Sequence, residues 1–285
     1  MDYTILHATN YRYPIEIHES YSIVHLQPRS DQFQYCTKYE LTVAPRTRVF
    51  SYLDRFANDV QHFAVLPDHD ILTVTARSNV VTVRPHEPPV PDPVTRDMLA
   101  ADLSLDALYD FLHESAYVAF GAELYALNAE IGEPQHDLVA WFLHAGAFIR
   151  ERFSYDKDAT TVRTTVEESI RRKAGVCQDF AHILVALCRF NRIPARYVSG
   201  YIFSGQKNSI LGADASHAWC EAYFPPHGWV GFDPTNNKLI NDEFVKIAVG
   251  RDYRDVSPVR GVYKGQTQSV MSVNVAMEAL SNQQQ

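Results

Sequence analysis

Apolar and polar residues alternate along the first 85 residues with the two-residue period of half-buried β-strands. In the segment KYELTVAP, Tyr39, Leu41 and Val43 fall on one face, and the segment ILTVTARSNVVTV repeats the pattern. Turn-forming stretches such as QPRSDQ and LPDHD separate these runs. The pattern predicts an N-terminal β-sandwich-like domain over residues 1–85.

Residues 86–96 are predicted to be a linker. The segment RPHEPPVPDPV in this region contains five prolines in eleven residues. Proline fixes φ and lacks a backbone N–H group, so such a segment can neither continue a sheet nor enter a helix. We therefore place a domain boundary here. A second domain is expected over residues 97–240, and a partly irregular C-terminal extension over residues 241–285.

The second domain begins with helical periodicity and ends with strands. The segment DLVAWFLHAGAFIRERF places Leu138, Phe142 and Ile149 on one helical face. Thr165 and Glu168 form the capping-box signature of a short helix. The segments IPARYVSGYIF, HAWCEAYF and GWVGFDP are typical of strands. The expected fold class is α+β.

The segment KAGVCQDFAHILVALCRF predicts a buried central helix that begins at Cys177, because its residues are apolar on nearly every face. Unpaired N–H groups and the positive helix end favour an anion in the first turn, and a thiolate is such an anion. The same N–H groups could hold a developing oxyanion. Free cysteines are also common core residues. Position alone therefore leaves Cys177 equally consistent with a structural role.

A histidine and an aspartate downstream change this balance. A thiolate nucleophile needs an imidazole as proton partner, and the imidazole needs an orienting group. SHAW supplies His217 on one strand and GFDPT supplies Asp233 at the end of the next, with the turn PPHG between them. A hairpin with an odd loop centred near Pro225 would place the two side chains opposite each other on one face. Alone, His217 is as often a core histidine, and Asp233 is often a turn residue.

The sequence contains no recognised motif for binding a metal ion or a cofactor. HExxH, CxxC, calcium-loop, GxSxG and phosphate-cradling glycine patterns are missing from the sequence. A zinc site made of Cys177, Cys188 and Cys220 is disfavoured, because eleven helical residues separate the first two by roughly 16 Å. We expect no cofactor and no metal, with Cys36, Cys188 and Cys220 as core residues.

Composition is that of an ordinary globular protein, with 46% hydrophobic and 21% charged residues. The formal net charge of -8 argues against a nucleic-acid partner, which requires a basic surface. No run of roughly 20 apolar residues predicts a membrane helix, and the N-terminal segment has no signal-peptide pattern. Four irregularly spaced cysteines do not suggest a disulfide framework. The expected setting is the cytoplasm.

The segments KAGVCQDFAHILVALCRFNRIPARYVSGY and SHAWCEAYFPPHGWVGFDPT resemble the transglutaminase-like superfamily of papain-fold cysteine enzymes. HLQPRSDQ and YLDRFANDV resemble the bacterial subgroup with an N-terminal β domain. The resemblance covers most of residues 1–240. Where this subgroup usually has Phe-Gly-Asn, the chain has Phe56-Ala57-Asn58. It implies a papain-like core in which a central helix packs on an antiparallel sheet.

The resemblance also implies site residues and an activity. Cys177 would be the nucleophile, His217 the general base and acid, and Asp233 the residue that orients His217. Tyr155 is a candidate for the oxyanion side chain, although a packing role is at least as plausible for it. The implied reaction is acyl transfer on an amide or peptide bond through a thioester, with a protein or peptide as substrate.

Two outcomes of this reaction stay open, as does a third possibility without catalysis. An amine acceptor would make the protein a transglutaminase, and water would make it a protease or amidase. Some members of the superfamily lose the cysteine and serve as interaction scaffolds. The presence of Cys177, His217 and Asp233 argues against that alternative here.

Overall fold

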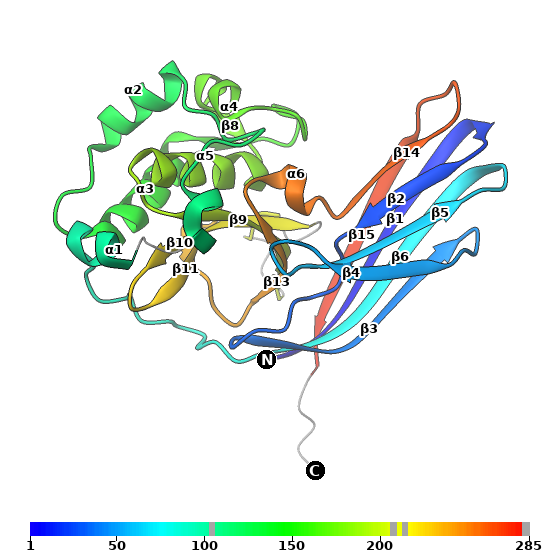
Figure 1. Cartoon of the computed structure of the whole chain (residues 1–285), viewed down its shortest axis with the longest axis horizontal. Helices are drawn as coiled ribbons and strands as arrows, with labels where there is room; N and C mark the ends of the chain where they lie inside the picture. The colour runs from blue at the N-terminus through cyan, green and yellow to red at the C-terminus, as the bar shows by residue number, and fades with distance from the viewer. Residues whose placement is uncertain (103–105, 206–209, 213–215, 281–285) are drawn as a thin grey trace, which may run out of the picture.

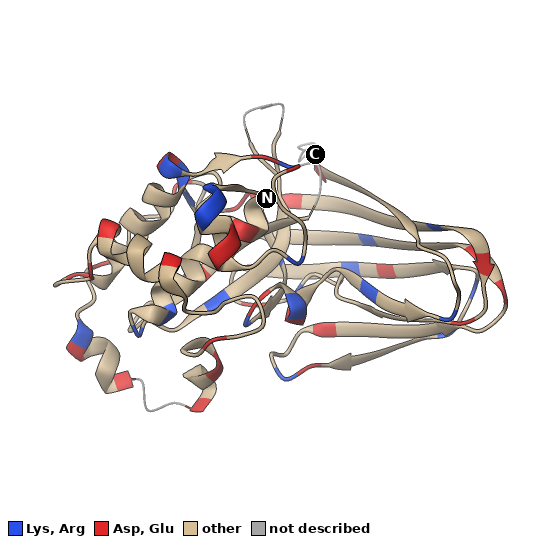
Figure 2. Ribbon diagram, turned by 90° about the horizontal axis from the view of Figure 1, so that it is seen from above, with Lys and Arg blue, Asp and Glu red and all other residues tan. Residues whose placement is uncertain are grey.

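A computed structural model of the chain describes residues 1–102, 106–205, 210–212 and 216–280. It has a β-rich half and a mixed helical half (Figure 1). Lys and Arg are interspersed with Asp and Glu over both halves (Figure 2). None of the helices in the described part of the chain is long and apolar enough to cross a lipid bilayer.

The β-rich half is a sandwich of two four-stranded antiparallel sheets. The N-terminal residues contribute six strands, and the C-terminal segment contributes β14 Val259–Tyr263 and β15 Val270–Ala279. The sheet orders are β15-β1-β6-β3 and β14-β2-β5-β4. Leu72, Val74 and Ala76 of one sheet and Phe63 and Val65 of the other share one apolar core. The apolar positions of the alternating pattern therefore face the interior, and the predicted sandwich is confirmed. The first six strands are β1 Asp2–Ile17, β2 Ser20–Val24, β3 Gln34–Ala44, β4 Val49–Leu53, β5 Asp59–Val65 and β6 His69–Thr82.

The C-terminal segment differs from the partly irregular extension that we expected. It forms β13 Phe244–Gly250, α6 Tyr253–Val256, β14 Val259–Tyr263 and β15 Val270–Ala279. β14 pairs with β2, and β15 pairs with β1 over ten residues. Their partners lie more than two hundred residues away in the chain. Local sequence patterns report poorly on such pairings, because cross-strand neighbours determine how well a strand fits.

The helical half is built around α5, Cys177–Phe190, which begins at the predicted residue. Every residue of α5 except Phe190 is buried, and the helix packs against the sheet β12-β11-β10-β9-β13. The predicted capping box of Thr165 and Glu168 is present at α4. The remaining elements are α1 Arg96–Asp102, the 3-10 helix Asp106–Phe111, α2 Ala122–Ile131, α3 Leu138–Arg152, β7 Ser154–Tyr155, α4 Val166–Arg172, β8 Ala174–Gly175, β9 Ala195–Ile202, β10 His217–Phe224, β11 Gly228–Asp233 and β12 Lys238–Leu239.

Two side-chain amides from the sandwich cover the outer edge of β13. The Gln34 amide accepts from the backbone N–H of Lys246 at 2.7 Å and donates to the Lys246 carbonyl at 2.7 Å. Asn58 does the same with Val249, at 2.9 and 2.8 Å. Each amide thus satisfies an edge peptide as a neighbouring strand would. The preceding Ala57 has φ +56°, a left-handed conformation that explains why glycine is usual at this position.

A buried ion cluster joins the same two halves. Glu221 of β10 contacts Lys246 Nζ at 2.7 Å and Arg196 at 2.5 Å, and Lys246 reaches Asp31 at 3.4 Å. Burial alone would raise the pKa of Glu221, but the charges of Lys246 and Arg196 outweigh it and lower the pKa to about 2. The carboxylate is therefore held ionised in the interior.

This cluster predicts a specific acid sensitivity. Glu221→Gln is expected to cost about 3 kcal/mol at pH 7, because it removes the anion that Lys246 and Arg196 compensate. A lowered folded-state pKa gives stability that is present above the ordinary Glu value of 4.5 and is lost as the pH falls towards about 2. Urea unfolding at pH 7, 4 and 3 should show the difference between wild type and variant shrinking below pH 4.5. A difference independent of pH would contradict the assignment.

Candidate active site

Cys177 is the first residue of α5, and 9% of its surface is exposed. The turn before it is fixed by Asp179, whose carboxylate accepts hydrogen bonds from the Val176 N–H at 2.8 Å and the Ser169 hydroxyl at 3.0 Å. A Cβ on Gly175 would lie 2.6 Å from a carboxylate oxygen of Asp179, so this position needs glycine. The local sequence thereby presents the thiol at the helix N terminus.

His217 and Asp233 lie on adjacent antiparallel strands and on the same face of their sheet. The Phe224–Gly228 pair closes an odd, three-residue loop, as predicted. The register is shifted from the prediction, however. Asp233 falls opposite Trp219, so His217 is its diagonal neighbour. The loop is centred one residue later than expected, and Gly228 with φ +75° takes part in the turn. Diagonal neighbours still lie within reach of long side chains.

The two side chains form a buried hydrogen-bonded pair. His217 Nε2 lies 2.8 Å from Asp233 Oδ2, and both side chains have 0% exposure. Burial lowers the pKa of His217, but the Asp233 charge and hydrogen bond, together with the Cys177 thiol, outweigh this and raise the pKa to about 10. Because Asp233 occupies Nε2, Nδ1 is the nitrogen available to the thiol. Nδ1 has no hydrogen-bond partner among the described residues.

Asp233 is held by two residues that the sequence analysis did not single out. Its carboxylate accepts from the Thr235 N–H at 2.8 Å and from the Asn236 side-chain amide at 2.7 Å. Burial would raise the pKa of Asp233, and the imidazole and these donors lower it. The tight DPTNN turn was the available signal, since backbone N–H groups shortly after an aspartate commonly bond its side chain.

Two tyrosines border the thiol. Burial raises the pKa of Tyr197 well above its ordinary value and that of Tyr253 to about 12, and the nearby Cys177 contributes to both shifts. Both phenols therefore stay neutral beside the sulfur. The Tyr253 N–H donates to Nε2 of His182, a buried histidine whose pKa burial lowers to about 4. No sequence motif pointed to these residues.

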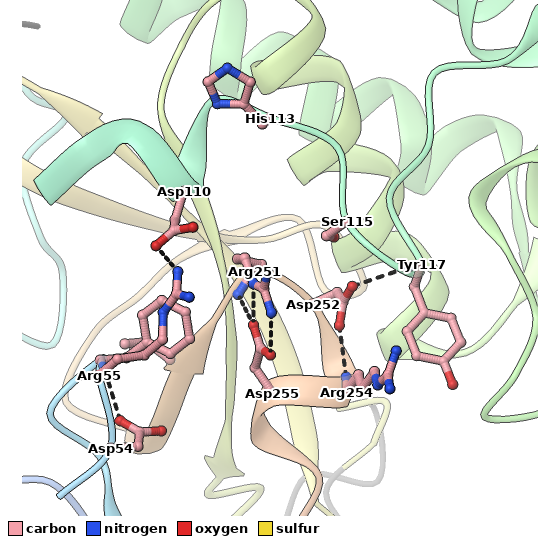
Figure 3. A network of polar contacts seen from close by, with 12 residues as sticks. Asp54, Arg55, Asp110, His113, Ser115, Tyr117, Arg251, Asp252, Arg254 and Asp255 are labelled. Atoms are coloured by element: carbon pink, nitrogen blue, oxygen red, sulfur yellow. Dashed lines mark hydrogen bonds and ion pairs between the residues drawn. The ribbon is translucent and has the colours of Figure 1, made fainter. Parts of the chain in front are cut away.

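A polar network fixes the short helix that carries Tyr253 (Figure 3). The Arg251 guanidinium makes two hydrogen bonds with the Asp255 carboxylate, at 2.8 and 3.0 Å, and its backbone N–H makes a third at 3.0 Å. Asp252 caps α6 by accepting from the Arg254 N–H at 2.8 Å and accepts from the Tyr117 N–H at 3.0 Å. Tyr253 follows Asp252 and precedes Asp255 in the chain, so hydrogen bonds on both sides of it fix the backbone that carries its side chain.

Tyr155 lies next to the segment that leads into α5. Its strand β7 pairs in parallel with β8, and Tyr155 is the register partner of Gly175, two residues before Cys177. Its ring packs edge-on against Phe180 with centroids 6.4 Å apart. The side chain is therefore near the helix entrance. Its role as an oxyanion donor stays a prediction.

The other cysteines lie away from this arrangement. Cys188 and Cys220 are fully buried, as expected, whereas Cys36 is partly exposed at the sandwich surface, contrary to expectation. Burial and a hydrogen bond with Cys188 raise the pKa of Cys220. Within the described ranges, no group of three or more His, Cys, Asp or Glu residues could hold a metal ion.

Comparison with known proteins gives consistent matches over both halves. Residues 126–234 match the transglutaminase-like superfamily, and residues 3–81 match the bacterial transglutaminase-like N-terminal region. The uncharacterized protein ML0607 of Mycobacterium leprae is 31% identical over 97% of this chain and 98% of its own. The uncharacterized protein Rv2569c of Mycobacterium tuberculosis is 33% identical, over 96% of this chain and 91% of its own.

A solved structure resembles the whole chain. It is named "Putative Cysteine Protease from Cytophaga hutchinsonii" and aligns over 99% of this chain and 92% of its own, with a TM-score of 0.74 and 23% sequence identity. At this identity the similarity establishes a shared fold. The α+β fold class is confirmed, and the family match over residues 126–234 identifies the core as transglutaminase-like.

Proposed function

The chain belongs to the transglutaminase-like superfamily, and from that membership we propose that it catalyses acyl transfer from an amide or peptide bond through a thioester on Cys177. The observation that carries this proposal is the buried His217–Asp233 pair, 2.8 Å apart, which leaves Nδ1 of the imidazole without a hydrogen-bond partner among the described residues. A raised imidazole pKa favours the imidazolium form. An imidazolium beside the sulfur stabilises the thiolate, which is the reactive nucleophile.

In the first half-reaction, the Cys177 thiolate attacks the carbonyl carbon of the substrate. A C–S bond forms, and the carbonyl oxygen becomes an oxyanion that the N–H groups in the first turn of α5 can stabilise. The C–N bond then breaks, and the departing nitrogen takes the proton from Nδ1 of His217. An amine leaves, and the acyl group remains as a thioester.

In the second half-reaction, the neutral His217 takes a proton from the acceptor. The acceptor attacks the thioester carbon, the C–S bond breaks, and the thiolate–imidazolium pair is restored. Water gives hydrolysis and thus protease or amidase activity, whereas an amine gives transglutamination. The proposed substrate is a protein or peptide that carries a carboxamide or a peptide bond. Nothing in the chemistry of the three residues separates the two outcomes.

The alternative is a non-catalytic scaffold with this fold. A scaffold would need neither a buried imidazole paired with a carboxylate nor a cysteine at the N terminus of the neighbouring helix. The preserved geometry favours catalysis, because a buried charged pair is costly to maintain without a compensating use.

The decisive experiment combines thiol reactivity with trapping of the acyl group. Cys177 should react with iodoacetamide at least tenfold faster than Cys36 at pH 6.5, although Cys36 is more exposed. Incubation with a peptide pool, acid quenching and mass spectrometry should then reveal an acyl adduct on Cys177 and identify the carbonyl donor. A Cys177 that alkylates no faster than Cys36 would support the scaffold.

A further inference from the structure

Asn236 connects the triad aspartate to a loop on the other side of the imidazole. Its side-chain amide donates to Asp233 Oδ2 at 2.7 Å and to the Leu211 carbonyl at 3.2 Å, and its oxygen accepts from the Leu211 N–H at 3.0 Å. Both N–H groups and the oxygen of the carboxamide are therefore hydrogen-bonded, to Asp233 and to the Leu211 backbone. One target orients the imidazole, and the other is backbone of the loop that precedes β10.

Gly212, the residue after Leu211, lies directly against the free nitrogen of the imidazole. A Cβ at this position would be 2.6 Å from Nδ1 of His217, and the backbone has φ +83°, which favours glycine. That separation is shorter than a typical hydrogen bond to nitrogen and well short of van der Waals contact. A methyl group there would thus occupy space in which a proton partner of Nδ1 has to fit. The missing side chain keeps that space open.

We propose that Asn236 is a positioning residue that couples the orientation of Asp233 to the placement of Gly212 beside Nδ1 of His217. This inference rests on the proposed function, since Nδ1 is the atom that exchanges protons with the leaving and attacking groups. The Asn236 carboxamide thus holds both the backbone beside Nδ1 of His217 and the Asp233 carboxylate that orients the imidazole.

A structural amide elsewhere in the chain supplies a matched control. Asn58 also uses its carboxamide on one backbone residue, Val249, and on one aspartate, Asp54, to which it donates at 2.8 Å; it accepts a further hydrogen bond from Arg29 at 2.7 Å. It has no contact with His217 or Asp233 in the described residues. Asn236→Ala and Asn58→Ala therefore remove comparable sets of hydrogen bonds, only one of which touches the triad.

The test is the pH profile of Cys177 alkylation by iodoacetamide, measured between pH 4 and 9 together with the melting temperature. In Asn236→Ala, loosened orientation of the imidazole should move the low-pH limb of the profile up by about one unit, with about a fivefold loss of rate at its former midpoint. Asn58→Ala should lower the melting temperature and leave the profile unchanged. Gly212→Ala, an independent probe, should slow alkylation at least tenfold with the melting temperature held within a few degrees.

The outcomes separate this inference from the proposed function. A reactive wild-type Cys177 with equal profiles in wild type and Asn236→Ala would overturn the inference alone. A wild-type Cys177 as slow as Cys36 would overturn both. If Asn236→Ala does not fold, Gly212→Ala decides: wild-type alkylation rates in that variant would refute the role assigned to the loop.

Discussion

Cys177→Ala is expected to abolish turnover while leaving the fold nearly unchanged. The variant removes the only atom that forms a bond to the substrate, so the rate should fall by about 10⁵-fold or more. The thiol is at the edge of the core with 9% exposure, so replacing it with a methyl group removes a single heavy atom and leaves only a small cavity. The melting temperature should therefore change by only a few degrees. Steady-state kinetics and thermal unfolding of the same preparation measure both effects.

Cys188→Ala provides the matched control for this experiment. Cys188 is fully buried in the same helix and has no place in the proposed chemistry. Cys188→Ala should keep full activity per folded molecule and lower the free energy of unfolding by about 1 kcal/mol, because it leaves a small cavity. If Cys177→Ala instead lost stability and kept its activity, Cys177 would be a packing residue.

Asp233→Asn should reduce the rate by about 10³- to 10⁴-fold at pH 7. The substitution keeps the shape of the side chain and removes the charge. Asp233 contributes both a charge and a hydrogen bond to the raised pKa of His217, whereas burial acts to lower it. In the variant burial dominates, the pKa of His217 falls, and the imidazolium that stabilises the thiolate is lost. The pH dependence of kcat/KM and of alkylation should show this change.

The same substitution should change the pH dependence of stability. A folded-state pKa of about 10 for His217 gives stability that is fully present below the ordinary value of 6.5 and is lost as the pH rises through about 10. Asp233→Asn should remove that decline between pH 6.5 and 10. Asp242→Asn is the control. Asp242 also pairs with a histidine, the exposed His86 at 2.9 Å, but neither residue takes part in the proposed reaction. Wild-type kinetics in Asp233→Asn would exclude it from the site.

Local features of this protein were predictable from the sequence, and those that depend on distant partners were not. Apolar periodicity placed α5 and its first residue, Cys177, because a fully buried helix needs no partner to be identified. The hairpin placed His217 and Asp233 on one face, since strand alternation has an invariant period of two. The predicted pairing register of the hairpin was wrong, because the loop is centred one residue later than expected and closes at Gly228.

The residues missed by the sequence analysis share one physical property. Asn236, Tyr253 and Leu211 meet the site through loops and a four-residue helix, whose placement follows from tertiary contacts. The pairing of β15 with β1 was missed for the same reason, because it joins the two ends of the chain. Turn chemistry after Asp233 offered a signal for Asn236. Neither hydrophobic period nor turn chemistry encodes the contacts of Tyr253, Leu211 or β15.

The position of β15 has a consequence for synthesis. Topologically, the helical half is an insertion between β6 and β14, and the sheet to which β1 belongs is incomplete until residue 279 has been made. Domains at the start of a chain commonly fold first as they emerge from the ribosome. Here the order is reversed for the final step: β1 waits for β15, which is translated more than two hundred residues later, so a nascent product that stops before β15 would leave β1 without its outer neighbour.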